Sequence, residues 1–398
     1  MKTINQFSIV AVLLLSAQVI ISCHLSQKEN ADSCDLGDYE SMTINIDPQN
    51  ATEPLESNQY TIDSIRSLII PDSLGFFYAA KFYVDNEKIY VMDTDNAKTI
   101  LVFDILGNYL YKLGERGRAK NEYIDAPRDF FVAKNGDVHA FDVWSQNVLI
   151  FDKNGKFIKT IETPDAHSFG LTSNDKYVYF LDHRDFADPS LSIYDPKSNT
   201  KKDLIPSRHF QCFYQPSFRT FFYNDTRLSH IPLLSDSVIV FKDDTVEKVV
   251  HFDFKCGFLT NDKPECVKVI DGIFPKDFGK CSKEYQGVFA IFDYQETESL
   301  ALMNYQYKSR YKTWLYDKRT KKTIHGDKIF PGFRASYNYY LKGNQIIAFV
   351  GKGNVDTLNE YCESEEFDEK DFKKSYSQVK DLRKGKIPVP ALFYITIK

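Results

Sequence analysis

A set of arginine, histidine and aromatic residues carries the clearest binding chemistry in this sequence. An aromatic ring offers an apolar face to a sugar or another planar group, and an arginine can bind a carboxylate through two parallel hydrogen bonds. The set comprises Arg116, Arg118, Arg128, Trp144, His183, Arg184, Arg219 and Tyr294. If the segments that carry them meet at one end of the fold, they predict a surface for a glycan, a peptide or a protein partner, without catalysis. The alternative is that they are solvated loop residues and that Trp144 packs in the interior.

Two histidines leave an enzymatic alternative open. His183 and His209 fall in predicted connections at that same end, where a histidine beside a bound cation could support a metal-assisted lyase or hydrolase reaction. The sequence has no Gly-x-Ser-x-Gly, His-Glu-x-x-His or Gly-x-x-x-x-Gly-Lys motif. We therefore expect no cofactor and no metal. His139 lies inside a predicted strand, and we expect it to be structural.

The elements that must position these residues are short strands in a repeated unit of about 45 residues. The first unit contains Ile89–Asp93 and Leu101–Asp104, and the second contains Val138–Asp142 and Leu149–Asp152. Repeats of this length, built from short apolar strands separated by Asp, Asn and Gly turns, are typical of β-propeller blades. If the second strand of each blade ends at an Asp, the loops that follow all lie at one mouth of the ring.

An aromatic residue recurs at the same place in each unit, and each occurrence indicates one blade. It falls at Phe103, Phe151, Tyr194, Phe241 and Tyr316, at intervals of 48, 43, 47 and 75 residues. The last interval is long because 254–287 is predicted to be an insertion. The strand Val288–Asp293 is assigned the place that Ile89–Asp93 has in the first unit.

We predict an all-β fold, a six-bladed β-propeller of four-stranded antiparallel blades over 60–398. The sixth blade must combine the two ends of the chain, because a ring has to hide the free edges of its first and last sheets. Its expected pieces are 337–341, 345–350, the C-terminal strand 391–398 and a segment near Ser64. Residues 364–384 have near-helical apolar spacing and predict one rim helix, with Gly385 at its C′ position.

The unit 93–123 resembles an NHL-type repeat. In that repeat a turn after an Asp, a Val-Phe-Asp strand, a Gly hairpin and a Gly-rich loop ending in an aromatic residue follow in order; here these are Asp93, 102–104, Gly107 and 114–123. The whole chain is similar to the bacterial six-bladed β-propeller lipoproteins, of NHL-repeat-like or TolB-like type. Residues 118–121 depart from the Gly-Pro-Gly that usually precedes the aromatic residue. The resemblance implies a binding or scaffold protein of the cell envelope.

The N-terminus indicates export. Lys2 precedes the apolar stretch 7–21, which is too short to span a bilayer comfortably and is typical of a signal peptide over 1–22. Ile20-Ile21-Ser22-Cys23 resembles a lipobox, which implies lipidation at Cys23 and an outer-membrane anchor, periplasmic or surface-exposed. Residues 23–59 are polar and without periodicity, and we expect them to be a flexible tether.

The composition argues against one class of partner, and the cysteine-containing insertion leaves a third function open. The formal net charge is −5 and no basic stripe is present, which argues against nucleic acid. Six cysteines follow Cys23, and we expect at least one disulfide among them, with Cys256, Cys266 and Cys281 as leading candidates. Since these three share the insertion 254–287, that segment could instead dock the protein into an envelope complex as a scaffold subunit.

Overall fold

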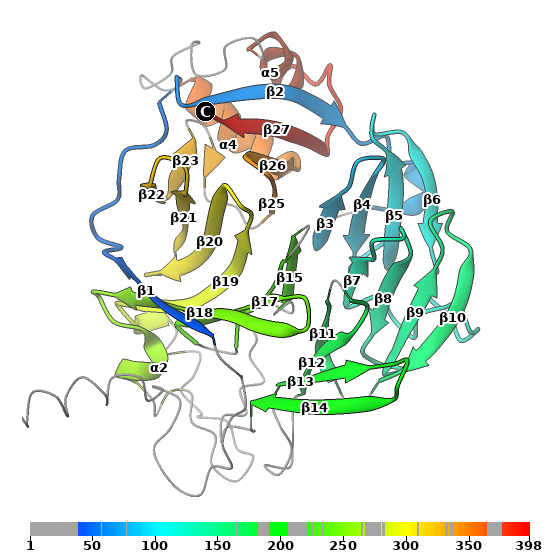
Figure 1. Cartoon of the computed structure of the whole chain (residues 1–398). Helices are drawn as coiled ribbons and strands as arrows, with labels where there is room; N and C mark the ends of the chain where they lie inside the picture. The colour runs from blue at the N-terminus through cyan, green and yellow to red at the C-terminus, as the bar shows by residue number, and fades with distance from the viewer. Residues whose placement is uncertain are drawn as a thin grey trace, which may run out of the picture. The chain divides into compact units, whose positions relative to one another are not determined.

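Six antiparallel sheets, each with four blade strands, form the blades of a propeller, as predicted (Figure 1). The computed structural model describes residues 39–398 except 57, 77, 164–165, 173, 182–190, 206–220, 225–226, 233–234, 264–265, 267–279, 281–282, 309, 331–332, 335–337 and 364–375. Blade 1 consists of β3 (Lys81–Val84), β4 (Lys88–Asp93), β5 (Thr99–Asp104) and β6 (Tyr109–Leu113). Blade 2 consists of β7 (Asp129–Val132), β8 (Val138–Asp142), β9 (Asn147–Phe151) and β10 (Phe157–Glu162). Blade 3 consists of β11 (Ala166–Leu171), β12 (Tyr177–Leu181), β13 (Leu191–Asp195) and β14 (Thr200–Ile205). Blade 4 contains β15 (Phe221–Asn224), β16 (Arg227–His230), β17 (Ser237–Lys242) and β18 (Thr245–Phe254). Blade 5 consists of β19 (Val288–Glu296), β20 (Leu300–Tyr307), β21 (Arg310–Asp317) and β22 (Lys322–Gly326).

The recurring aromatic residue marks the third strand of each of these blades, β5, β9, β13, β17 and β21. Phe103 and Phe241 are completely buried, and Phe151 is 2% exposed. Successive side chains of a strand point to opposite faces of the sheet, and these rings lie on the face that packs into the apolar core. The aromatic residue therefore recurs because it occupies the same packing position in each of these blades.

The sixth blade joins the two ends of the described chain. Its order is β25 (Tyr339–Lys342), β26 (Gln345–Val350), β27 (Ala391–Ile397) and β2 (Tyr60–Ser67). The C-terminal strand β27 pairs antiparallel with both neighbours, and β2 and β27 lie side by side in Figure 1. The composite closure predicted from the sequence is confirmed.

Blade 5 corrects one strand assignment. The segment 288–293 belongs to β19, the first strand of the blade, and not to a second strand followed by a loop. The actual second strand is β20, which the repeat did not reveal. The assignment failed because β19 is buried along its whole length and therefore has the apolar pattern expected of a central strand.

The predicted tether contains a further strand. β1 (Glu40–Ile46) pairs in parallel with β18 as a fifth strand of blade 4, and Met42 and Ile44 pack against the core there. Beyond β1, the amide of Leu55 donates to the carbonyl of Ile329, and Leu55 is 4% exposed. A flexible tether over 23–59 is therefore wrong from β1 onward, and the period-two alternation of Met42, Ile44 and Ile46 was the signal.

Neighbouring blades pack through glycine hairpins. Gly107, in the turn between β5 and β6, has a φ of +93°, and a Cβ there would lie 2.0 Å from the carbonyl oxygen of Ser67 at the end of β2. Gly155 has the same role one blade on, where a Cβ would lie 2.7 Å from the ring of Tyr111. Only glycine allows both the positive φ and this close approach.

Short elements complete the described chain. They are η1 (Asp72–Leu74), α2 (Leu259–Asp262), β23 (Lys328–Phe330), β24 (Phe333–Arg334), α4 (Lys352–Cys362) and α5 (Tyr376–Arg383). The predicted rim helix 364–384 is described only as α5, which packs Val379 and Leu382 into the core, and Gly385 follows it with a φ of +69°. The helix α4 was not predicted. Within the described part of the chain, none of the helices combines the length and apolar character that a membrane span requires.

Candidate functional site

Asp142 fixes two loops beside each other at one end of blade 2. Its side chain is completely buried at the end of β8. One carboxylate oxygen accepts from the amide of Trp144 at 3.0 Å, and the other accepts from the amide of Ile124 at 2.8 Å. Because Trp144 follows the second strand of blade 2 and Ile124 lies in the connection from blade 1, these two kinds of loop meet at the same end of the ring.

Asp93 has the same role in blade 1. It is completely buried, and it accepts from the amides of Asp95 and Asn96 in its own loop and, at 3.4 Å, from the amide of Tyr78 in the connection from blade 6. A buried carboxylate that accepts several backbone N–H groups holds them in one geometry. We call the end of the ring that carries 94–98, 114–128 and 143–146 the Trp144 end.

The connection 114–128 is a folded loop with its own hydrogen bonds. Arg116 and Tyr123 form a parallel bridge, and the Tyr123 hydroxyl, which is buried, donates to the carbonyl of Leu113 at 2.8 Å. Asp125 joins this loop to the loop 94–98, which follows the second strand of blade 1. The ammonium of Lys98 lies 2.5 Å, and the Nε of Arg116 lies 3.6 Å, from the same carboxylate oxygen of Asp125. The loops of blades 1 and 2 therefore form one continuous surface.

The structure places four of the predicted residues at this surface. Trp144 is 69% exposed, so it does not pack between blades. Arg116 and Arg118 are exposed, and Arg128 is half-buried beside Asp129 at the start of β7. Burial lowers the pKa of Arg128 to about 10. The amide of Arg128 donates to the carbonyl of Phe141, which places its backbone at the end of β8 that leads to Trp144.

The other predicted residues do not join this surface in the described chain. Tyr294 is 1% exposed inside β19, its ring packs against Phe252, and its hydroxyl donates to Glu296 at 2.7 Å. Its assignment to the mouth is wrong, because no loop follows Asp293. Three further residues, His183, Arg184 and Arg219, lie outside the described residues, as does His209 of the enzymatic alternative.

Sequence reasoning missed two exposed apolar residues of the same surface. Ile124 is 45% exposed and Tyr78 is 39% exposed. The signal that could have found them is the Asp that ends the second strand, because it binds the connection from the preceding blade as well as its own loop. Lys98 and Asp125 were missed because their pairing depends on the folded loop.

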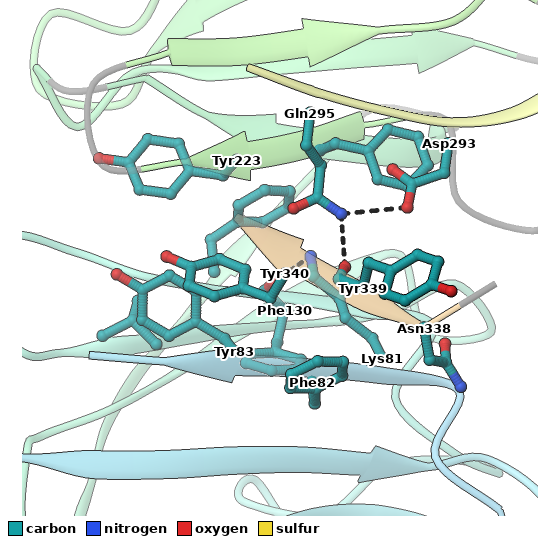
Figure 2. Close-up of a pocket in the computed structure, with 13 residues that line it drawn as sticks. Lys81, Phe82, Tyr83, Phe130, Tyr223, Asp293, Gln295, Asn338, Tyr339 and Tyr340 are labelled. Atoms are coloured by element: carbon teal, nitrogen blue, oxygen red, sulfur yellow. Dashed lines mark hydrogen bonds between the residues drawn. The ribbon is translucent and has the colours of Figure 1, made fainter. Parts of the chain in front are cut away.

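The central channel is filled by side chains from the first strands of the blades. Its lining comprises Lys81, Phe82, Tyr83, Phe130, Phe131, Val132, Phe222, Tyr223, Asp293, Gln295, Asn338, Tyr339 and Tyr340 (Figure 2). About 30 Å³ is left for the centres of water molecules, which is room for about two of them. The described side chains of these strands therefore pack closely around a small cavity.

Polar groups of the channel link neighbouring blades. Lys81 donates to Asp129 at 2.5 Å, and its ammonium lies 3.8 Å from the ring centre of Phe131. On the opposite side, the amide nitrogen of Gln295 donates to Asp293 at 3.0 Å and to the carbonyl of Tyr339 at 2.6 Å, as Figure 2 shows. These bonds join blade 1 to blade 2 and blade 5 to blade 6, so the buried charges have structural partners.

His139 joins blade 2 to blade 3, in agreement with the structural role predicted for it. It is 8% exposed, and its Nδ1 lies 2.8 Å from the hydroxyl of Tyr177 in β12. Burial lowers the pKa of His139 to about 4. The imidazole is therefore neutral in the folded protein near neutral pH.

We expect this histidine to make stability depend on pH. The unfolded chain protonates His139 near its ordinary pKa of about 6.5, whereas the folded protein does so only near 4. The stability that the neutral ring provides is complete above pH 6.5 and is lost as the pH falls toward 4, by about 3 kcal/mol over that range. Urea titrations across this range should show a shallower decline for His139→Gln than for the wild type. Tyr177→Phe keeps the titrating ring and should keep the steep decline; equal slopes for wild type and His139→Gln would contradict the prediction.

The described cysteines differ in their bonding. Cys266 is disulfide-bonded, whereas Cys256 and Cys362 are free, and the candidate Cys281 lies outside the described residues. The expected disulfide is confirmed, and Cys256 was a wrong candidate for it. Among the residues that the structure describes, no group of three or more His, Cys, Asp or Glu side chains is placed to hold a metal ion.

These features define a six-bladed β-propeller with an exposed aromatic and basic surface over blades 1 and 2. The chain belongs to the family described as a domain of unknown function, DUF4934, whose model matches residues 76–387. No protein of curated function matches the chain. The NHL-type resemblance stays a prediction.

One of the solved structures that the chain matches supports the fold. A candidate exported protein from Bacteroides fragilis NCTC 9343 has a TM-score of 0.69 and 14% identity, over 90% of this chain and 100% of that one. A member of the DUF4221 family from Bacteroides vulgatus has a TM-score of 0.46 and 10% identity, over 86% of this chain and 99% of that one. The extracellular domain of a candidate one-component system from B. thetaiotaomicron has a TM-score of 0.37 and 11% identity, over 74% and 32%. At these identities the first of these likenesses shows the fold alone, and the other two carry no argument.

Proposed function

We propose that this protein is a lipid-anchored binding module of the cell envelope that holds a glycan, peptide or protein partner at the Trp144 end of its propeller, without catalysis. The observation that carries the proposal is Trp144, a large aromatic side chain that is 69% exposed on a short loop. Exposed tryptophans are enriched among the residues that dominate binding energy at protein interfaces. The packed channel favours a partner bound on the surface over a small molecule held inside.

The rigidity of the loop supports the proposal. The carboxylate of Asp142 accepts from the amide of Trp144 and from the hydroxyl of Ser145, at 3.0 and 2.9 Å. The side-chain amide of Gln146 donates to the carbonyl of Val143 at 2.7 Å. A loop that is fixed before binding loses little conformational entropy when a partner arrives.

Replacing Trp144 tests the surface. Trp144→Ala should weaken binding of its partner by about 1–3 kcal/mol while leaving the free energy of unfolding within about 0.5 kcal/mol of wild type, because the side chain is exposed. Glycan and peptide arrays probed with both proteins measure the first quantity, and urea titration measures the second. Leu106→Ala is the matched control, since Leu106 is 70% exposed on the hairpin after β5. Array binding that Trp144→Ala leaves intact would reject this surface as the site.

The lipid anchor rests on the sequence of the N-terminus. Cys23 follows the apolar stretch 7–21 and Ile20-Ile21-Ser22, which supports lipidation at its side chain. Cys23→Ser should therefore move the protein from the membrane fraction to the soluble fraction of cells. Cys34→Ser is the control and should leave the protein in the membrane fraction. Membrane retention of Cys23→Ser, with no lipid mass on the mature N-terminus of the wild type, would contradict the proposal.

A further inference from the structure

We propose that the partner of the Trp144 end is an acidic polypeptide segment that also carries an apolar side chain, an inference that rests on the proposed function. It follows from what the loops of this surface leave available for binding. Two of their cations, Arg118 and Lys120, have no partner among the described residues, their carboxylates accept hydrogen bonds from the chain, and the large side chains of Trp144 and Ile124 are exposed.

The free cations are Arg118 and Lys120. Both side chains are exposed, and neither has a hydrogen bond or ion pair in the described part of the chain. The loop that carries them is fixed by hydrogen bonds: the amide of Gly117 donates to the carbonyl of Tyr123, and the amide of Ala119 donates to the carboxylate of Glu122, both at 2.8 Å. The fixed backbone of this loop thus presents two positive side chains without partners, on a chain whose formal net charge is −5.

These cations lie on the same side of blade 2 as Trp144. The hydroxyl of Thr160 on β10 donates to the carbonyl of Lys120 at 3.3 Å. Three residues further along, the amide of Thr163 donates to the carbonyl of Gln146, two residues after Trp144 in the same loop. The strand β10 therefore places the basic loop beside the tryptophan loop, and Ile124 joins both through Asp142.

Every carboxylate of these loops accepts a hydrogen bond from the chain itself. Asp125 binds Lys98 and Arg116, Glu115 binds Lys112 at 2.6 Å, and Glu122 binds a backbone amide. Asp95 accepts from the hydroxyl of Thr94 at 3.5 Å. The negative groups that could repel an acidic partner, or bind a basic one, are engaged within the loops.

The same hydrogen bonds favour a peptide over a neutral glycan. Sugar hydroxyls need free carboxylates and amides beside the aromatic ring, and here Asp142 and the amide nitrogen of Gln146 are used internally. The exposed groups of these loops include the apolar side chain of Ile124, the cations Arg118 and Lys120, and the amides of Asn96 and Asn121. A peptide with an apolar residue between carboxylates complements this set, since charge complementarity directs association and the aromatic anchor supplies affinity.

Selection from a random peptide library displayed on phage tests the inference. The purified wild-type protein is immobilised, and the selected peptides are sequenced and synthesised. We expect them to be enriched in Asp and Glu around an aromatic or aliphatic residue. Their dissociation constants should rise about tenfold or more in Trp144→Ala and in Arg118→Glu, and also when NaCl is raised from about 50 to 300 mM.

Matched variants and a parallel glycan array separate the outcomes. Leu106→Ala and Lys322→Glu change an exposed apolar residue and an exposed charge away from these loops, and should leave the dissociation constants within about twofold. Selected peptides without acidic enrichment that still depend on Trp144, or glycans that depend on Trp144 in their place, would overturn the acidic partner and leave the proposed function standing. If neither library yields a binder that depends on Trp144, the proposed function itself is overturned.

Discussion

Removal of residues 391–398 should leave a protein that no longer unfolds in one cooperative transition and that accumulates in the insoluble fraction. These residues contain β27, which pairs with β26 on one side and with β2 on the other. Four of its side chains, Ala391, Leu392, Phe393 and Ile395, are completely buried. Without β27 the ring cannot close, and the exposed edges of β26 and β2 become sites for aggregation.

A point substitution gives the same test in a soluble protein. Phe393→Ala should lower the free energy of unfolding by about 3–5 kcal/mol, because it leaves a cavity in a fully buried position. Deletion of Lys398 alone removes an exposed residue and should have little effect. Circular dichroism and urea titration measure both. A truncated protein with the thermal midpoint of the wild type would show that the last eight residues do not close the ring.

Glu296→Ala should have an effect of similar size at the contact between blades 4 and 5. Glu296 is 2% exposed and binds both Lys248, at 2.6 Å, and Lys318. Its removal leaves the ammonium of Lys248, whose side chain is 11% exposed, without its carboxylate. Breaking a buried pair in this way costs about 3–5 kcal/mol. Glu298→Ala is the control, since Glu298 is 80% exposed and its ion pair with Arg227 should contribute about 0–1 kcal/mol.

The same ion pairs predict how the effect depends on pH. Burial favours the neutral acid, but Lys248 and Lys318 outweigh it and hold the pKa of Glu296 below its ordinary value. The stability from the charged form is therefore complete above the unfolded pKa of about 4.3 and is lost as the pH falls below it. The difference in unfolding free energy between wild type and Glu296→Gln should shrink between about pH 5 and pH 3. A difference that stays constant over this range would show that the charge of Glu296 contributes nothing.

The blade count was predictable because one packing position recurs. Phe103, Phe151 and Phe241 each occupy the third strand of a blade, and a buried aromatic ring is needed there each time. The closure was predictable for a different reason, since a ring has no free sheet edge and the apolar C-terminal strand had no other partner. The strand β19 was misplaced because a strand buried on both faces gives no alternation to mark its position in the sheet.

The candidate site was only partly predictable. Arg116, Arg118 and Trp144 could be placed at one end of the ring because the loop after each second strand lies on the same side as the connection between blades. Tyr294 could not, because its position depended on the misplaced strand. Contacts such as that of His139 with Tyr177, 38 residues apart, depend on the register between blades, which a single sequence does not show.

The strand β1 gives the molecule a place where mechanical load enters. A pull on the chain ahead of Tyr39 would first act on the ladder between β1 and β18, in which seven residues of β1 pair with blade 4. Behind it, the hydrogen bonds of Thr52 with His325 and of Leu55 with Ile329 take up the remaining tension. Only after these attachments fail would the force reach β2, the strand that closes the ring. Under the proposed lipid anchor at Cys23, this order would separate the strain of tethering from the closure of the propeller.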